Sequence, residues 1–100
     1  MADTLTVVAR IFPKPGKEAE VETLLRTMAA VVRRAEEDCL VYRPHRSAKD
    51  PAVFLFYEQY RSGEAFELHR SAPHLRESRE QLRALVAKPT EVEIYRALTD

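Results

Sequence analysis

The sequence predicts a single α+β domain of the ferredoxin-like kind, with one antiparallel sheet and two helices on one of its faces. The chain has 100 residues, which suits one hydrophobic core and is too short for two. Hydrophobic residues make up 45% of the chain and charged residues 32%, a balance typical of a folded, well-solvated domain. Strand-like and helix-like patterns follow one another in the order β-α-β-β-α-β. We therefore expect one domain over residues 1–100, with a core from about residue 4 to residue 97.

Four segments have the composition of strands. Residues 4–12 are β-branched or apolar and stop at Pro13, which cannot continue a ladder of backbone hydrogen bonds. Residues 39–46 and 53–60 are separated by a short loop rich in turn formers, which favours an antiparallel hairpin. Residues 91–97 form the last predicted strand.

Two helical regions separate these strands. After the first turn, apolar residues recur at the spacing of one helical stripe, namely Val21, Leu24, Leu25, Met28, Val31, Val32 and Ala35. We interpret the acidic run 36–38 as the solvated end of this helix. Ser62 has the side chain of a helix cap, and Pro73 predicts a break near Ser71 followed by a restart that runs to about Val86.

Apolar residues on both parities of the strands predict that both faces of the sheet are covered. The first apolar set is Leu5, Val7, Val53 and Leu55. The second set, expected on the opposite face, is Val8, Phe12, Phe54 and Phe56. Because two helices on a single side leave one face bare, we predict a homodimer in which matching faces pair. In the alternative, these aromatic residues pack under loops of a monomer.

The charge balance and the single cysteine exclude several classes of protein. Sixteen basic and sixteen acidic residues cancel, so no global field recruits nucleic acid or an anionic membrane, and we expect neither as a partner. No apolar segment approaches the roughly 20 residues that span a bilayer, and no signal-peptide pattern opens the chain. Cys39 cannot form an internal disulfide, and the chain lacks the several Cys or His ligands of a zinc site. We expect a cytoplasmic protein without a bound metal.

Three segments resemble the antibiotic biosynthesis monooxygenase (ABM) family: residues 15–22, residues 56–60, and residues 66–75 with their histidine pair. The resemblance covers roughly residues 4–95 and implies a dimeric α/β barrel with a small-molecule pocket between sheet and helices. It further implies oxidation of quinol-like or polyketide aromatic substrates by O₂ without metal, flavin or haem. Relatives of the family include an isomerase of a phosphorylated signal sugar, so the fold alone does not fix the function.

The haem-degrading branch of these relatives is disfavoured. The Asn, Trp and His of that branch have Ala9, His69 and Arg79 as approximate counterparts here, and the chain contains no Trp.

His69 is the leading catalytic candidate, because an imidazole on the helical face shared with Ala65 and Phe66 is expected to point toward the sheet. Its ordinary pKa near 6.5 lets it accept a proton from a phenol or enol. A purely structural, hydrogen-bonded histidine is the alternative. Glu58 interrupts an apolar strand and could orient His69 or a substrate hydroxyl, or pair with an arginine.

Four further residues are candidates for substrate binding. Tyr57 offers a phenol beside an apolar ring, and His74 is expected near the pocket mouth or as a stabiliser of the helix restart. Ala9 and Phe66 complete this set.

A phosphorylated substrate would need a cation inside the pocket, and Arg10, Arg43 and Arg46 lie on or near strands where they could supply it. Three functions therefore remain open. The preferred one is a cofactor-independent monooxygenase that acts on a small substrate with O₂. The alternatives are an isomerase of a small carbonyl compound with His69 as proton shuttle, and a non-enzymatic ligand-binding stress-response dimer.

Overall fold

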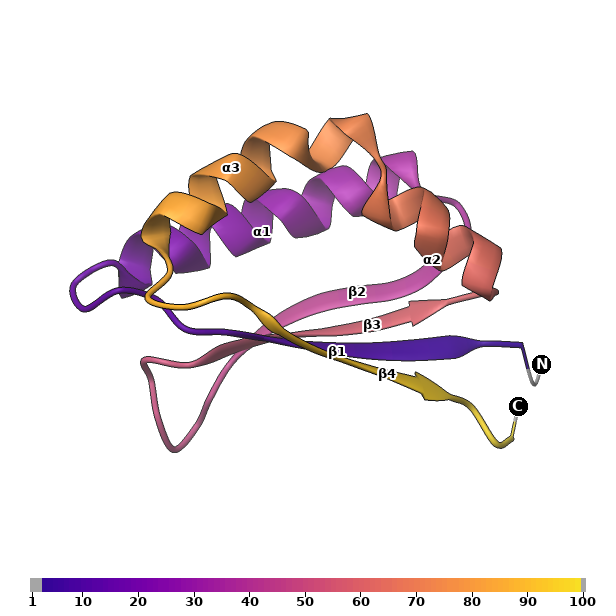
Figure 1. The fold of residues 1–100 in the computed structure, drawn as a ribbon, viewed down its shortest axis with the longest axis horizontal. Coiled ribbons are helices and arrows are strands. Elements are labelled where there is room, and N and C mark those ends of the chain that lie inside the picture. Colours follow the sequence, from indigo (N-terminus) through magenta and orange to yellow (C-terminus); the bar gives the residue numbers. More distant parts are fainter. Residues whose placement is uncertain (1–2, 100) are drawn as a thin grey trace.

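A computed structural model describes residues 3–99, which form a four-stranded sheet and a layer of helices on one of its faces (Figure 1). The elements are β1 (Leu5–Ile11), α1 (Glu18–Ala35), β2 (Cys39–Arg46), β3 (Phe54–Tyr60), α2 (Gly63–Arg70), the 3-10 turn η1 (Pro73–Leu75), α3 (Arg76–Leu85) and β4 (Glu91–Arg96). The strands lie in the order β2-β3-β1-β4, and each neighbouring pair is antiparallel. This is the ferredoxin-like arrangement, so the predicted fold class is confirmed.

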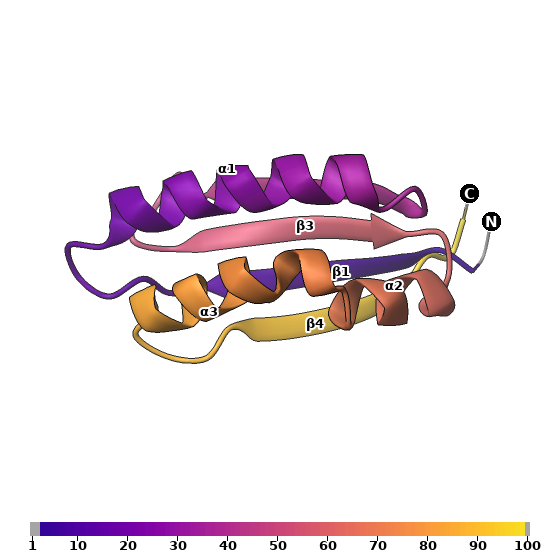
Figure 2. The same ribbon diagram turned by 90° about the horizontal axis from the view of Figure 1, so that it is seen from above.

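α1 lies over the β2–β3 half of the sheet, whereas α2 and α3 lie over the β1–β4 half (Figure 2). One stripe of α1 is buried against the sheet, namely Val21, Leu24, Leu25, Met28, Ala29 and Val32. The acidic first turn and the basic last turn complement the helix dipole. Glu36 has an extended backbone, so the helix ends there and the chain turns toward β2.

The second helical region is interrupted as predicted. The Ser62 hydroxyl accepts a hydrogen bond of 3.2 Å from the backbone N–H of Ala65, which caps the start of α2. α2 ends at Ser71, and Pro73 occupies the first turn of η1, where the missing N–H has no consequence for hydrogen bonding. None of the helices within residues 3–99 is both long and apolar enough to cross a membrane.

The pairing of β1 with β3 corrects one prediction about the sheet faces. Ala9 lies opposite Phe56 and Ile11 lies opposite Phe54, and all four residues are buried on the helix side. The prediction that Phe54 and Phe56 share a face with Val8 is therefore wrong. Alternation within each strand was interpreted correctly, but the register between strands decides which parities share a face.

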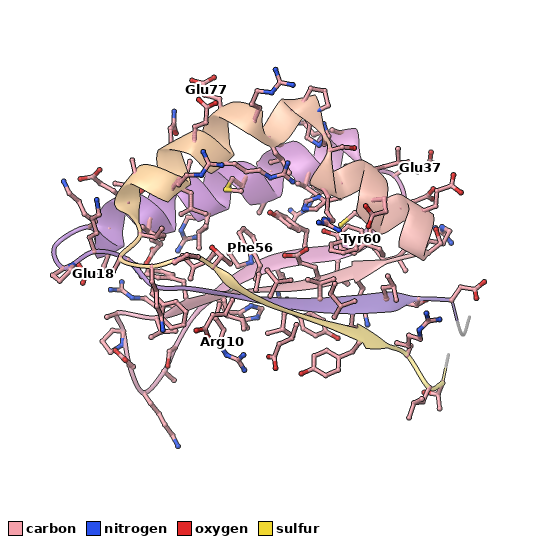
Figure 3. All side chains as sticks on the ribbon, viewed as in Figure 1. Arg10, Glu18, Glu37, Phe56, Tyr60 and Glu77 are labelled. Carbon is pink, nitrogen blue, oxygen red and sulfur yellow. The ribbon has the colours of Figure 1, made fainter. Side chains whose placement is uncertain are left out.

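The face of the sheet away from the helices is mixed in character. Figure 3 shows Arg10 on this side and Phe56 on the helix side. The Arg10 guanidinium lies 2.6 Å from the carboxylate of Glu93 on β4, while Val8 and Tyr57 remain partly exposed on the same face. This face is less apolar than predicted. The phenylalanines of β3 lie on the other face, and the ion pair between Arg10 and Glu93 lies on this one.

β4 forms one edge of the sheet, and all six of its residues are exposed. Val92 and Ile94 pair with buried residues of β1 and point to the helix side, yet each is 53% exposed. Tyr95, on the other face, is 50% exposed. An edge strand with large apolar side chains exposed on both faces is a strong candidate for contact with another chain.

Candidate functional site

Glu58 is a carboxylic acid buried on the helix side of β3. It is 5% exposed, pairs in register with Val7 and Tyr42, and its Oε1 accepts a 2.6 Å hydrogen bond from the hydroxyl of Tyr60. Burial raises the pKa of Glu58 to about 7, although the Tyr60 hydroxyl and, more weakly, Arg79 act in the opposite direction. A carboxyl group with a pKa near neutrality can both accept and release a proton, as acid–base catalysis requires.

His69 lies on the inner face of α2 and is 6% exposed. Its Nδ1 lies 2.9 Å from Oε1 of Glu36, and because a carboxylate only accepts, the network assigns the hydrogen to Nδ1. Nε2 then carries a lone pair and lies 4.0 Å from Oε1 of Glu58, too far for a direct hydrogen bond. Burial lowers the pKa of His69, and Glu36 opposes this decrease. His69 is therefore a neutral imidazole whose free nitrogen is turned toward Glu58.

Glu36 connects His69 to a second histidine. Its side chain is 12% exposed, and its Oε2 accepts a 2.6 Å hydrogen bond from Nε2 of His74 in η1. The interpretation of residues 36–38 as a solvated helix end is wrong for Glu36, although its two neighbours in that run are exposed as predicted. No local pattern could identify Glu36, because its partners lie 33 and 38 residues further along the chain.

Together these side chains form a line from the core to the surface, which we call the buried polar chain: Tyr60, Glu58, His69, Glu36 and His74. The first two come from β3, the third from α2, and the last two from the residue after α1 and from η1. The His74 side chain is 28% exposed, so the line reaches solvent at this end. The arrangement can hold a proton at several adjacent positions.

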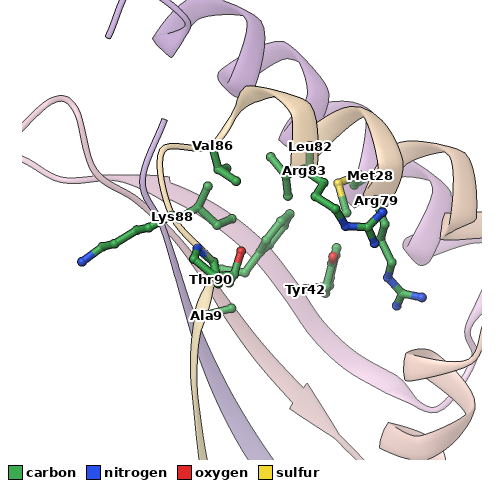
Figure 4. A pocket seen from close by; sticks show the side chains of 12 residues that line it. Ala9, Met28, Tyr42, Arg79, Leu82, Arg83, Val86, Lys88 and Thr90 are labelled. Atoms are coloured by element: carbon green, nitrogen blue, oxygen red, sulfur yellow. The ribbon is translucent and has the colours of Figure 1, made fainter. Parts of the chain in front are cut away.

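A cavity of about 580 Å³ lies beneath α3, between the helices and the sheet (Figure 4). Most of its wall is apolar, with contributions from Ala9, Ile11, Met28, Phe56, Leu82 and Val86. Tyr42 is also in the wall, and its ring stacks on Phe56 with 4.3 Å between the centroids. This volume suits a small planar molecule.

Neither Glu58 nor His69 lines this cavity, but Tyr42 and Arg79 join it to the buried polar chain. The ring centroid of Tyr42 lies 5.2 Å from that of His69. Burial raises the pKa of Tyr42, and the charge of Glu58 adds to this increase. Tyr42 is therefore a neutral phenol at physiological pH, placed between the cavity and the two acid–base groups.

Arg79 is a site residue whose role the sequence did not reveal. Its guanidinium donates hydrogen bonds of 2.7 Å to the carbonyl oxygen of His69 and 2.8 Å to that of Arg70, at the end of α2. The His69 carbonyl also accepts a 3.2 Å hydrogen bond from the backbone N–H of Ala72, so Arg79 adds side-chain caps to the end of α2 and to the backbone that carries His69.

The structure brings together only part of the predicted site. Ala9 lines the cavity, and His69 and Glu58 face the same side of the sheet. Phe66 packs in a smaller core cluster beside Tyr60, and His74 belongs to the buried polar chain instead of the cavity wall. Tyr57 points to the opposite face of the sheet.

The arginines predicted on or near strands do not line this cavity. Arg10 pairs with Glu93 on the opposite face, and Arg46 contacts Glu22 on α1 and the ring of Phe54. The cations of the cavity come from α3 and from the segment after it, and no sequence pattern singles them out.

Cys39 is a half-buried thiol next to this site. Its sulfur donates a 3.4 Å hydrogen bond to the carbonyl oxygen of Val41, and burial raises its pKa to about 12. Cys39 is therefore protonated and a poor nucleophile. The predicted cytoplasmic location, which rests partly on this lone cysteine, stays a prediction.

Over residues 3–99 no group of three or more His, Cys, Asp or Glu side chains is arranged so that it could hold a metal ion.

Comparison with known proteins places this geometry in a family. The model of the antibiotic biosynthesis monooxygenase family matches residues 4–81. Rv0793 of Mycobacterium tuberculosis, a provisionally assigned monooxygenase, is 32% identical over 100 residues, which are all of this chain and 97% of that protein. Its solved structure has a TM-score of 0.86 to this chain, at 31% identity and 97% coverage of both chains.

Two other solved structures are similarly close. A provisionally assigned antibiotic biosynthesis monooxygenase from Caulobacter crescentus has a TM-score of 0.91 at 28% identity and covers 98% of this chain with 92% of its own. PA3566 of Pseudomonas aeruginosa has a TM-score of 0.86 at 30% identity, with coverage of 99% and 98%. With the family model spanning more than half of its length, this chain belongs to the antibiotic biosynthesis monooxygenase family.

Proposed function

We propose that this protein is a monooxygenase that oxidises a small quinol or polyketide-like aromatic substrate with O₂, without a bound cofactor. For a simple quinol, C₆H₄(OH)₂ and O₂ would give the hydroxyquinone C₆H₃(OH)O₂ and water. One oxygen atom enters the ring and the other leaves as water. Family membership and the provisional monooxygenase assignments of its relatives support the reaction class.

The observation that carries the proposal is the pair of acid–base groups beside an apolar cavity. Glu58 has a pKa of about 7, and the unprotonated nitrogen of His69 lies 4.0 Å from its carboxyl oxygen. Removal of a phenolic proton makes an aromatic ring electron-rich, and such an anion can pass an electron to O₂. The substrate radical and superoxide then combine to a ring hydroperoxide, and cleavage of its O–O bond with loss of water leaves one oxygen atom on the ring as the new quinone carbonyl.

Tyr42 is the proposed link between the substrate and these groups. Its raised pKa keeps its phenol neutral, so it can pass a proton on but cannot hold the negative charge itself. We propose that Tyr42 gives its own proton to Glu58 or His69 while it accepts that of the substrate. The proton then leaves through Glu36 and the solvent-facing His74.

Oxygen uptake with a panel of quinols, corrected for their autoxidation, tests this function. His69→Gln and Glu58→Gln remove the two acid–base groups, and each is expected to lower kcat by about 10²-fold or more. His45→Gln is the matched control, because His45 is an exposed histidine on β2 that lies outside the buried polar chain and the cavity wall. Labelled ¹⁸O₂ should place one labelled atom in the product.

Uptake that is the same in the wild type and in both variants, with all proteins folded, would contradict the proposed roles. Uptake absent from every protein, while a quinol analogue still binds, would favour the non-enzymatic ligand-binding alternative.

One observation favours the isomerase alternative. A phosphorylated carbonyl compound needs a cation in the pocket, and Arg79 and Arg83 both line the cavity. The same buried polar chain could move a proton between carbons next to a carbonyl. Exchange of substrate hydrogen with deuterated water, without any consumption of O₂, would identify this reaction.

We also propose that the protein is a homodimer that covers β4 and the sheet face away from the helices. Its support is the exposure of Val92, Ile94 and Tyr95 on an edge strand, which a second copy could cover. Sedimentation analysis at micromolar concentration is expected to give twice the chain mass of 11.5 kDa, and Ile94→Lys is expected to shift the protein toward monomer. A monomeric wild type would refute this part of the proposal.

A further inference from the structure

The wall of the cavity beneath α3 is unbalanced in charge. Among the residues that line it are Arg79, Arg83 and Lys88, and no Asp or Glu from the described part of the chain is among them. The remaining wall is mostly apolar, so it offers no acidic group to neutralise a cation; Arg83 itself is exposed and Arg79 is half-buried.

Arg79 is held in place before any ligand arrives. Its two terminal nitrogens donate to the carbonyl oxygens of His69 and Arg70, so the guanidinium plane is fixed at the end of α2. These bonds use neutral acceptors, so they leave its positive charge without a direct ion-pair partner within residues 3–99. The nearby carboxyl of Glu58 offsets it only in part, because burial keeps that group partly protonated at neutral pH.

Arg83 follows Arg79 by four residues on α3, so both side chains project from the same face of the helix. Figure 4 shows both guanidinium groups at the end of the cavity nearer Tyr42. Within residues 3–99, no hydrogen bond or ion pair engages the Arg83 side chain, and two like charges at this spacing repel each other. An anion between them would relieve that repulsion.

Lys88 does not belong to this pair. Its ammonium lies 3.3 Å from the carboxylate of Glu91 and 4.0 Å from the ring centroid of Phe12, and in Figure 4 it points away from the cavity. The uncompensated charge of the wall therefore comes from the two arginines of α3.

We propose that this cavity binds a planar aromatic compound with an anionic oxygen group, a carboxylate or a phosphate, which sits between Arg79 and Arg83. The aromatic part lies against the stacked rings of Tyr42 and Phe56, and the acidic group lies at the α3 side of the wall. Guanidinium groups match both oxyanions in geometry, so either would be held by charge-assisted hydrogen bonds. The inference rests on the proposed function in one respect only, that the ligand enters this same cavity.

Binding calorimetry with three matched probes tests the proposal without any turnover. The probes are 1-naphthol, 1-hydroxy-2-naphthoate and 1-naphthyl phosphate, which share one ring system and differ in the acidic group. We expect one or both anions to bind the wild type about tenfold or more tightly than 1-naphthol, the range for a charge-assisted hydrogen bond. Comparison of the two anions shows whether the site prefers carboxylate or phosphate.

Arg83→Gln is the decisive variant, because Arg83 is exposed and makes no hydrogen bond or ion pair within residues 3–99, so its loss should leave the fold intact. It is expected to remove most of the preference for the anions while 1-naphthol binds as before. Arg76→Gln removes the same charge from the same helix outside the cavity wall and is expected to change nothing. Arg79→Lys keeps the charge and loses the planar fork, and should weaken the anions by a smaller factor.

Equal binding of 1-naphthol and both anions to the wild type would overturn the proposal, as would an anion preference that survives Arg83→Gln. Tight binding of an anion by a protein that consumes no O₂ would leave this inference standing and refute the monooxygenase. Oxidation of neutral quinols with no preference for acidic ones would support the monooxygenase and refute this inference.

Discussion

Replacement of Glu58 by glutamine should stabilise the folded protein at neutral and alkaline pH. In the unfolded chain this carboxyl loses its proton near its ordinary pKa of 4.5, whereas in the folded protein the pKa is about 7. Between these values the folded state binds more protons than the unfolded state, so a rising pH favours unfolding. Glutamine has the same shape, can accept the hydrogen bond from Tyr60 through its Oε1, and carries no charge to bury.

The size of the effect follows from the two pKa values. At about 1.4 kcal/mol for each pH unit, ionisation of Glu58 in the folded protein costs about 3 kcal/mol once the pH exceeds about 7. The variant and the wild type should therefore be about equally stable near pH 4.5, and the variant should gain up to about 3 kcal/mol by about pH 8. Such a gain is a large part of the stability of a small domain.

Urea unfolding followed by circular dichroism measures this difference at each pH, at one fixed protein concentration because a dimer would link stability to concentration. His69 also titrates in this range. Its lowered pKa makes the fold less stable as the pH falls below about 6.5, but this contribution is present in both proteins and cancels in their difference. Glu37→Gln, an exposed neighbour of Glu36, is the control and should change stability by no more than about 0.5 kcal/mol.

The reasoning fails if Glu58→Gln is less stable than the wild type at about pH 8, or if the difference does not change with pH. The first result would mean that the carboxylate is stabilised by groups that outweigh its burial. The second would mean that its pKa is the same in the folded and unfolded chains.

Three further changes test the packing around the site. Tyr60→Phe removes the hydroxyl that donates to Glu58, so we expect the pKa of Glu58 to rise further in an NMR titration and the protein to lose about 1–3 kcal/mol at neutral pH. Ser62→Ala removes the cap of α2 and should cost about 0.5–2 kcal/mol in urea unfolding, whereas an unchanged midpoint would show that the cap contributes nothing. Leu75→Ala empties a fully buried position under η1 and should cost about 2–5 kcal/mol, with a smaller loss if the core collapses onto the space.

Signals confined to a few neighbouring residues were sufficient to predict most of the fold. The cap at Ser62 and the proline at position 73 fix a helix start and a helix break by backbone chemistry that acts within one turn. The apolar stripe of α1 likewise follows from a spacing of three to four residues along the chain. These features do not depend on what the rest of the chain does, so a single sequence reveals them.

Features that depend on pairing between distant segments were not predictable in this way. The sequence pattern predicts the wrong face for Phe54 and Phe56, because alternation gives each strand two faces but does not say which faces coincide across a sheet. The local pattern predicts a solvated helix end at Glu36, because acidic residues at that position are usually exposed. Its role becomes visible only when α2 and η1 bring two imidazoles to it.

His69 lies buried on the inner face of α2, as expected, whereas the catalytic roles predicted for His69 and Glu58 stay predictions. A buried titratable group needs a hydrogen-bond partner. The sequence shows that such a group lies on an apolar face, but it does not show which residue is the partner. Here Tyr60 and Glu36 supply the hydrogen-bond partners of Glu58 and His69 from within the fold, and neither of these two groups lines the cavity.

The separation between the cavity and the buried polar chain constrains any mechanism at this site. Glu58 keeps a pKa of about 7 only while it is shielded from water, so direct contact with a solvated cavity would lower its basicity. Tyr42 keeps that shield closed and is itself held neutral by the same burial. The proposed proton path therefore crosses this wall at the phenol oxygen of Tyr42. Phenylalanine at this position would keep the aromatic ring in the cavity wall but lack the hydroxyl that carries the proton. Tyr42→Phe should therefore abolish turnover while the affinity for an aromatic ligand is retained.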